Sequence, residues 1–268
     1  MNSVYPNPST WWGSFTFNDR QILRWKIGPL TIFVRYLSKE WQITYERLEE
    51  FGDSESTWCV DQVDSIPEEF GNTSRYIFGK ASNVLTVTPI LADRPVISRP
   101  RSPFNLALGE ETTLYVSTPL WVELAVGDSK IKLDEIAMQR PSDTWFGPST
   151  REGELCYASS TYCRLGLEEL PQRYHRAITP VLIRNQANSA LSVERLNVPA
   201  PHLPLYTTPS GQLWTPKIVL TREEDGEMAA LRIEKNPPEE ARDGMEVRKP
   251  RKVSSEGVLI RAFNAMFN

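Results

Sequence analysis

The chain has 268 residues, of which 40% are hydrophobic and 24% are charged, so it is long enough to bury a substantial core in the manner of an ordinary globular protein. Its formal net charge of −4 provides no field that would hold a phosphate backbone, and we expect no nucleic-acid partner. The 21 prolines exceed the 14 glycines, and eight tryptophans and nine tyrosines accompany them, which favours short strands joined by turns over long helices.

Targeting signals are not visible in the sequence. The N-terminal residues lack the basic and apolar regions of a secretion signal, and no apolar run approaches the roughly 20 residues of a membrane helix. Three cysteines are too few, and odd in number, for a disulfide framework, and they suit a reducing compartment. We therefore expect a cytoplasmic protein.

The first 48 residues predict an antiparallel meander because apolar residues alternate with polar ones in successive short runs. The expected strands are residues 14–17, 22–27, 30–36 and 41–48. An acidic, polar stretch follows over residues 49–74, and we interpret it as a long surface excursion, with Trp58 as its anchor if it is a binding loop.

Residues 93–103 carry three prolines and three arginines, after strands expected at 75–78 and 84–91. Proline donates no hydrogen bond to a sheet ladder, so this stretch is typical of an edge or an inter-domain linker. We place a domain boundary there, between an N-terminal antiparallel β domain over residues 1–95 and a C-terminal β-sandwich domain over 96–235.

The strongest sheet signal is the stretch 111–126, ETTLYVSTPLWVELAV, in which two β-rich apolar runs meet at Pro119. Because proline lacks an N–H, we expect a bend or an edge there and two strands instead of one. The other expected strands are residues 130–138, 154–158, 161–165, 178–183, 192–198, 203–207, 213–220 and 228–235. This spacing predicts a mostly β fold with two antiparallel β-sandwich-like domains and a short C-terminal helix.

The C-terminal residues 236–268 predict a charged tether and an amphipathic helix. Residues 236–252 are polar and hold too little apolar surface to bury. After them, apolar residues recur at the spacing of one helical face, and a basic cluster precedes that face. The candidates for contact with a partner or an anionic membrane are Arg248, Lys249, Arg251, Lys252, Leu259, Phe263 and Met266. The alternative is a helix that folds back onto its own domain.

The most distinctive segment is residues 142–162, SDTWFGPSTREGELCYASSTY, and it supplies the candidate ligand-binding residues Asp143, Trp145, Phe146 and Glu154. A hairpin with its tip at Ser159-Ser160 would place Cys156 opposite Cys163, within the span of a disulfide. The two cysteines are therefore a candidate thiol pair. The alternative is that they pack as ordinary buried cysteines.

Catalytic and metal-binding motifs are lacking. The three cysteines and two histidines show none of the short spacings of a zinc site, and nothing places a nucleophile such as Cys156 beside a base such as His175. No phosphate-binding glycine loop and no nucleophile elbow occurs. We expect no metal, no cofactor and no enzymatic activity.

The pieces SDTWFG and GELCY, together with TLYVSTPLWVEL upstream, resemble the prokaryotic domain-of-unknown-function family 432. The resemblance spans most of the chain. It implies no activity, cofactor or catalytic residue, and for partners it implies a setting near a mechanosensitive channel.

We therefore expect a non-enzymatic protein-interaction or regulatory module that binds a protein partner, forms a homo-oligomer or joins a membrane channel or transporter complex. The alternative is a carbohydrate-binding or glycoside-cleaving β-sandwich, since glycosidases use paired carboxylates and tryptophans stack on sugars. An exposed cleft lined by Asp143, Trp145 and Glu154 would favour that alternative, and a buried Trp145 would end it. Ligand and partner are not identified by the sequence.

Overall fold

The computed structural model describes residues 10–49, 56–68, 70–80, 82–100, 102–161, 163–167, 170–225, 228–253 and 259–263. These residues form many strands and two short 3-10 turns, η1 (Ala200–His202) and η2 (Glu239–Ala241), so the mostly β class is confirmed. No helix in this part of the chain is long and apolar enough to cross a membrane.

The chain divides into two compact units, each assembled from separated stretches. Unit 1 combines Met1–Ile90, Leu120–Arg140 and Arg173–His175, and unit 2 combines Leu91–Pro119, Pro141–Gln172 and Arg176–Asn268. The division differs from the predicted one because the chain returns twice to unit 1, and because residues 236–268 belong to unit 2 instead of standing apart as a tether.

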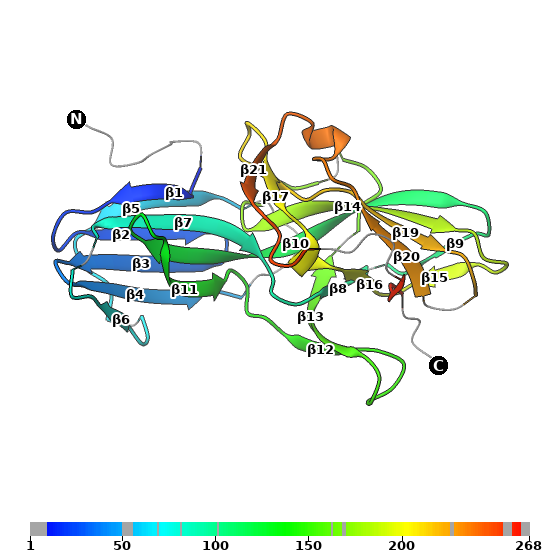
Figure 1. Ribbon diagram of the computed structural model, residues 1–268, viewed down its shortest axis with the longest axis horizontal. Coiled ribbons are helices and arrows are strands. Elements are labelled where there is room, and N and C mark those ends of the chain that lie inside the picture. Colours follow the sequence, from blue (N-terminus) through cyan, green and yellow to red (C-terminus); the bar gives the residue numbers. More distant parts are fainter. Residues whose placement is uncertain are drawn as a thin grey trace. The chain divides into compact units, whose positions relative to one another are not determined.

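Unit 1 contains the predicted antiparallel meander of β2 (Ile22–Ile27), β3 (Leu30–Leu37) and β4 (Glu40–Arg47), which lie side by side in Figure 1. Two edge strands complete this sheet: β5 (Trp58–Val63) pairs with β2, and β6 (Ser74–Ile77) pairs with β4. The residues of β5 were predicted to lie in a surface excursion, but they form a strand that pairs antiparallel with β2.

A second group of strands covers this sheet within unit 1. It contains β1 (Gly13–Thr16), β7 (Val84–Leu91) and β11 (Ile131–Ala137). Aromatic rings join the two layers: Phe15 meets Trp25 edge to face at 5.0 Å, and Phe17 meets Trp41 in the same way at 4.9 Å. These four side chains are fully buried and form the centre of the core of unit 1.

The stretch predicted as two strands is one strand of 16 residues, β10 (Glu111–Val126). It pairs with β14 (Arg176–Asn185) as far as Pro119, and with β11 from Trp121 onward. Pro119 therefore lies where the partner strand changes, and this position tolerates a residue that lacks an N–H, so the predicted break is wrong.

The larger sheet of unit 2 is built on the first part of β10 and on β14 (Figure 1). Next to β14, β18 (Leu213–Trp214) and β19 (Ile218–Arg222) run parallel to it. The sheet continues through β17 (Leu205–Thr207) to β21 (Met245–Arg248), and through β20 (Met228–Ile233) to β22 (Leu259–Arg261). Parallel pairs were not predicted, and they arise because β14 is followed by long connections instead of a hairpin.

A smaller sheet of unit 2 has the order β12 (Asp143–Phe146), β13 (Glu154–Thr161), β8 (Val96–Pro100) and β16 (Leu196–Val198), and β9 (Phe104–Leu106) pairs separately with β15 (Leu191–Val193). Strand β8 lies inside the predicted linker, yet it is a central strand with a buried Ile97. Its prolines lie before the strand and at its last residue, where they remove no hydrogen bond from the interior of the ladder.

The described parts of the C-terminal stretch pair with strands of unit 2. Strand β21 pairs with β17, and residues predicted as a helix form β22, whose partner is β20. Ala262 and Phe263 are buried, and Phe263 forms a bridge to Leu196. A short helix is marginal by itself, whereas pairing with β20 gives the backbone of β22 hydrogen-bonding partners. Met266 lies outside the described residues.

Candidate functional site

The four predicted ligand-binding residues lie on β12 and β13, and the register separates them. Trp145 is opposite Leu155, and Phe146 is opposite Glu154. Because neighbouring strand residues point to opposite faces, Asp143 and Trp145 share one face while Phe146 and Glu154 share the other. Trp145 and Glu154 therefore lie on opposite faces of this strand pair.

The face with Trp145 is an exposed strip. Trp145 is 43% exposed and Leu155 opposite it is 44% exposed. The Trp145 indole donates to the Ser149 carbonyl at 2.7 Å, and Asp143 forms an ion pair with Arg94 at 3.2 Å. The polar groups of this strip are thus occupied by local partners.

The hairpin that would place Cys156 opposite Cys163 is not formed. Strand β13 continues through Ser159-Ser160 instead of turning there, and Cys156 lies opposite Thr144. Both thiols are buried, and this burial raises the pKa of each to about 12. Cys156 packs with Ile97 in the core, so the structure supports the packing alternative.

The predicted basic and apolar contact residues of the C-terminus lie on unit 2. The Arg251 guanidinium donates to the Leu91 carbonyl at 2.8 Å, and the Lys252 amide donates to Pro201. Arg248 is the last residue of β21, and Lys249 beside it is exposed. Phe263 is buried, so it offers no surface for a membrane, and the side chain of Leu259 lies outside the description.

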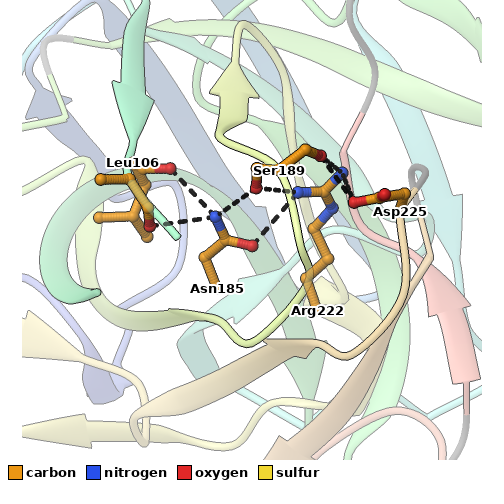
Figure 2. A network of polar contacts seen from close by, with 6 residues as sticks. Leu106, Asn185, Ser189, Arg222 and Asp225 are labelled. Atoms are coloured by element: carbon orange, nitrogen blue, oxygen red, sulfur yellow. Dashed lines mark hydrogen bonds and ion pairs between the residues drawn. The ribbon is translucent and has the colours of Figure 1, made fainter. Parts of the chain in front are cut away.

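A buried polar network links the ends of β14 and β19, as Figure 2 shows. The Arg222 guanidinium donates to Asn185 Oδ1 at 3.2 Å and to the Ser189 carbonyl at 3.0 Å. The Asn185 amide donates to Leu106 and Ser189 carbonyls, and the Ser189 hydroxyl donates to Asp225 at 2.6 Å. These groups satisfy one another, so the network stabilises the strand ends and leaves no group to act on a ligand.

His175 is buried in unit 1, where its Nδ1 lies 2.9 Å from the Ser56 hydroxyl. Gly28 is close to the ring: a methyl group placed on its Cα would lie 2.4 Å from Nδ1. The histidine is therefore enclosed by packing and by Ser56, which fits a structural role. Sequence reasoning considered it as a zinc ligand and as a base for Cys156, and excluded neither role by geometry.

Residues of η2 and of the larger sheet line a pocket of about 560 Å³ in unit 2, which we call the η2 pocket. Such a volume falls within the range of ligand-binding sites. Its floor is apolar: Ile178 of β14 lies beside Trp214 of β18 in register, and Ala241 of η2 packs against both. Trp214 is 6% exposed, so this part of the floor is largely desolvated.

Carboxylates form the wall of the η2 pocket above this floor. Glu239, Glu240 and Asp243 line it against one cation, Arg242, which pairs with Glu239 at 3.2 Å. The lining as a whole is therefore acidic and attracts positive charge.

Glu240 is the fixed member of this wall. The Tyr115 hydroxyl donates to its Oε1 at 2.6 Å, whereas its Oε2 is buried and has no donor among the described residues. A buried carboxylate oxygen without a donor is unfavourable unless a ligand supplies one.

Polar residues of the opposite wall are engaged with each other. The Thr208 hydroxyl lies 2.9 Å from that of Ser210, and the Gln212 amide donates to the carbonyls of Arg176 and Leu213. No histidine or cysteine is among the residues that line the η2 pocket. The pocket thus has the chemistry of binding and lacks a nucleophile with a base.

Sequence reasoning missed this site because its parts are distant in the chain. The acidic residues were assigned to a flexible tether, and the floor residues to ordinary strands. One local signal was present: Gly244 ends the acidic turn, and a Cβ there would lie 2.8 Å from the Ala241 carbonyl and 3.4 Å from Tyr206. A glycine that permits such a close approach indicates a packed turn.

A metal site is not found, since the described residues contain no group of three His, Cys, Asp or Glu side chains able to hold an ion. No curated protein and no solved structure matches the chain. The model of one protein family of unknown function, DUF432, matches residues 11–267. Because this match covers nearly the whole chain, the protein belongs to the DUF432 family.

Proposed function

We propose that the protein is a non-enzymatic interaction module whose η2 pocket binds a lysine or arginine side chain of a partner protein. The observation that carries the proposal is Glu240, which is held by Tyr115 through one oxygen and buries the other without a donor. An ammonium or guanidinium group supplies that donor and neutralises the wall, and Trp214 offers an apolar surface for the side-chain stem.

A protein partner fits the surroundings of the pocket better than a small amine does. Leu167 lines the pocket and is partly exposed, and Met245, which follows the acidic turn directly, is 72% exposed. Exposed apolar side chains beside a charged pocket are typical of protein contact sites. The expected partner segment therefore carries a basic residue flanked by apolar residues.

Basic residues next to apolar segments also occur where a membrane protein enters the cytoplasm. A subunit of a channel or transporter would present this chemistry, in keeping with the partner class that the sequence resemblance implies. We retain the cytoplasmic setting expected from the sequence, and the three free cysteines support it. We do not propose carbohydrate binding, because Trp145 and Glu154 lie on opposite faces of their hairpin.

A positional-scanning peptide library tests the proposal. We expect peptides with lysine or arginine at one position to be enriched on the wild-type protein, and this enrichment to disappear on the Glu240→Gln variant. Glu224→Gln, which removes an exposed carboxylate outside the pocket, is the matched control and should leave the enrichment unchanged. Equal selection of acidic and basic peptides by the wild-type protein would overturn the proposal.

A further inference from the structure

Arg99 of β8 and Arg195, which directly precedes β16, lie at one end of the pairing of these two strands in the smaller sheet of unit 2. In the antiparallel register of β8 and β16, Leu196 is opposite Ser98. If this register is continued by one position beyond β16, Arg195 comes opposite Arg99. Directly opposed residues lie on the same face with their Cβ atoms about 5 Å apart, so the two guanidinium groups share one space.

Like charges directly opposite each other destabilise a sheet, and a carboxylate normally separates them. Among the described residues, no ion pair or hydrogen bond of either guanidinium is found, and the Nε of Arg195 is buried without an acceptor. The electrostatics agree: desolvation and then Arg99 lower the pKa of Arg195, and Glu194 opposes them only as the weakest cause.

The neighbourhood provides a further donor. Strand β13 runs parallel to β8 on its other side, with Ser160 beside Arg99, and Ser160 is exposed. The face thus presents two guanidinium groups and a hydroxyl in a row across three strands. Guanidinium groups bind tetrahedral oxyanions in a bidentate manner, and hydroxyl groups add a further donor.

We propose that Arg99, Arg195 and Ser160 form a binding site for a phosphate group. A phosphate would accept hydrogen bonds from both guanidinium groups, including the buried Nε of Arg195, and would remove the repulsion between them. The site is distinct from the η2 pocket, since none of its three residues lines that pocket and its charge is opposite.

Calorimetric titration with inorganic phosphate at constant ionic strength tests the site. We expect the wild-type protein to bind phosphate, and Arg99→Gln and Arg195→Gln each to weaken binding by about tenfold or more. The control Arg232→Gln, which removes an exposed arginine elsewhere in unit 2, should bind like the wild type. Absence of binding, or equal weakening by all three substitutions, would overturn the proposal.

Thermal unfolding separates a binding role from a structural one. Phosphate should raise the melting temperature of the wild-type protein, and this rise should be lost in Arg195→Gln. In phosphate-free buffer the same substitution should raise the melting temperature, because it removes a like-charge pair. A lowered melting temperature there would indicate that Arg195 stabilises the fold and would contradict the site. If Arg195→Gln does not fold, the phosphate titration and the thermal unfolding are both made on Arg99→Gln, because Arg99 is exposed.

The source of the phosphate group is resolved by a second ligand. Methyl phosphate that binds as tightly as inorganic phosphate would support a site for a phosphate monoester. Binding of inorganic phosphate alone would support a site for the free ion. Equal affinity for phosphate and chloride would contradict both, because it would show general attraction of anions without recognition of the oxyanion.

Discussion

The hydroxyl of Tyr115 donates a 2.6 Å hydrogen bond to Glu240 Oε1, and these two residues are separated by 125 positions in the chain. This contact joins strand β10 to the turn η2 and fixes one oxygen of a carboxylate that lines the η2 pocket. The orientation of Glu240 therefore depends on a residue of the sheet, and the recognition of a cationic group depends on that orientation.

Replacing Tyr115 with phenylalanine removes this hydrogen bond and keeps the ring. We expect Tyr115→Phe to lower the free energy of unfolding by about 1 kcal/mol and to weaken binding of a basic peptide about threefold, because Glu240 loses its fixed orientation. Tyr157→Phe is the matched control, since it removes a hydrogen bond to Asp93 outside the pocket. Equal affinities of the two variants would argue against a positioning role for Tyr115.

Gly28 should not tolerate a side chain. Its φ is +54°, and a Cβ would lie 2.4 Å from His175 Nδ1. We expect Gly28→Ala to destabilise the protein by about 3 kcal/mol, since the left-handed backbone and the overpacking against the ring both oppose it. Gly79→Ala is the control because a Cβ at this residue would have no atom within 4 Å, and chemical denaturation should show a change below about 0.5 kcal/mol.

The network of Figure 2 predicts a large effect at Arg222. Replacing this buried arginine with methionine leaves Asn185 Oδ1 and the Ser189 carbonyl without the donor that they share. We expect Arg222→Met to lower the free energy of unfolding by about 3 kcal/mol in urea. The exposed Arg232→Met should change it by less than about 0.5 kcal/mol, and similar effects of the two would show that the network contributes little.

The cysteines should differ in reactivity. Burial raises the pKa of Cys156 and of Cys163 to about 12, so at pH 8 both remain thiols, whereas Cys59 is exposed. We expect iodoacetamide to modify Cys59 in the native protein and the other two only in urea, as mass spectrometry would show. Fast modification of Cys156 in the native state would contradict its burial.

The same shift predicts how stability depends on pH. A thiol whose folded pKa exceeds its unfolded value favours the folded state below the unfolded pKa, near 8.5 for cysteine. This contribution should decline as the pH rises from there through about 12. Replacing Cys156 with alanine should make the alkaline loss of stability less steep, and an unchanged pH profile would assign that loss to other groups.

The sequence predicted the strands well where one face is buried. The runs 22–27 and 84–91 coincide with β2 and β7, because alternation and turn residues bound them on both sides. Proline misled the prediction twice, at Pro119 and in β8, since a missing N–H matters only where the ladder would use it. Each proline removes one backbone N–H donor. Whether this interrupts a strand depends on whether the neighbouring strand would accept a hydrogen bond from that position.

The candidate site could not be predicted in the same way. Its floor joins Ile178 to Trp214, a parallel pair that no local pattern encodes, and its wall lies in a stretch whose polar composition is typical of a tether. The Asp143–Phe146 segment was singled out for its composition, and the strand register then divided its side chains between two faces.

A double-mutant cycle between Glu240 and a bound basic residue tests the central claim most directly. The four affinities are those of wild-type protein and Glu240→Gln for a library-selected lysine peptide and for the same peptide with norleucine in place of lysine. We predict that each single change weakens binding about tenfold or more and that the second change then adds little, which gives a coupling free energy of about 1.5 kcal/mol or more. Additive effects would contradict the account, because they would show that the lysine and Glu240 do not interact.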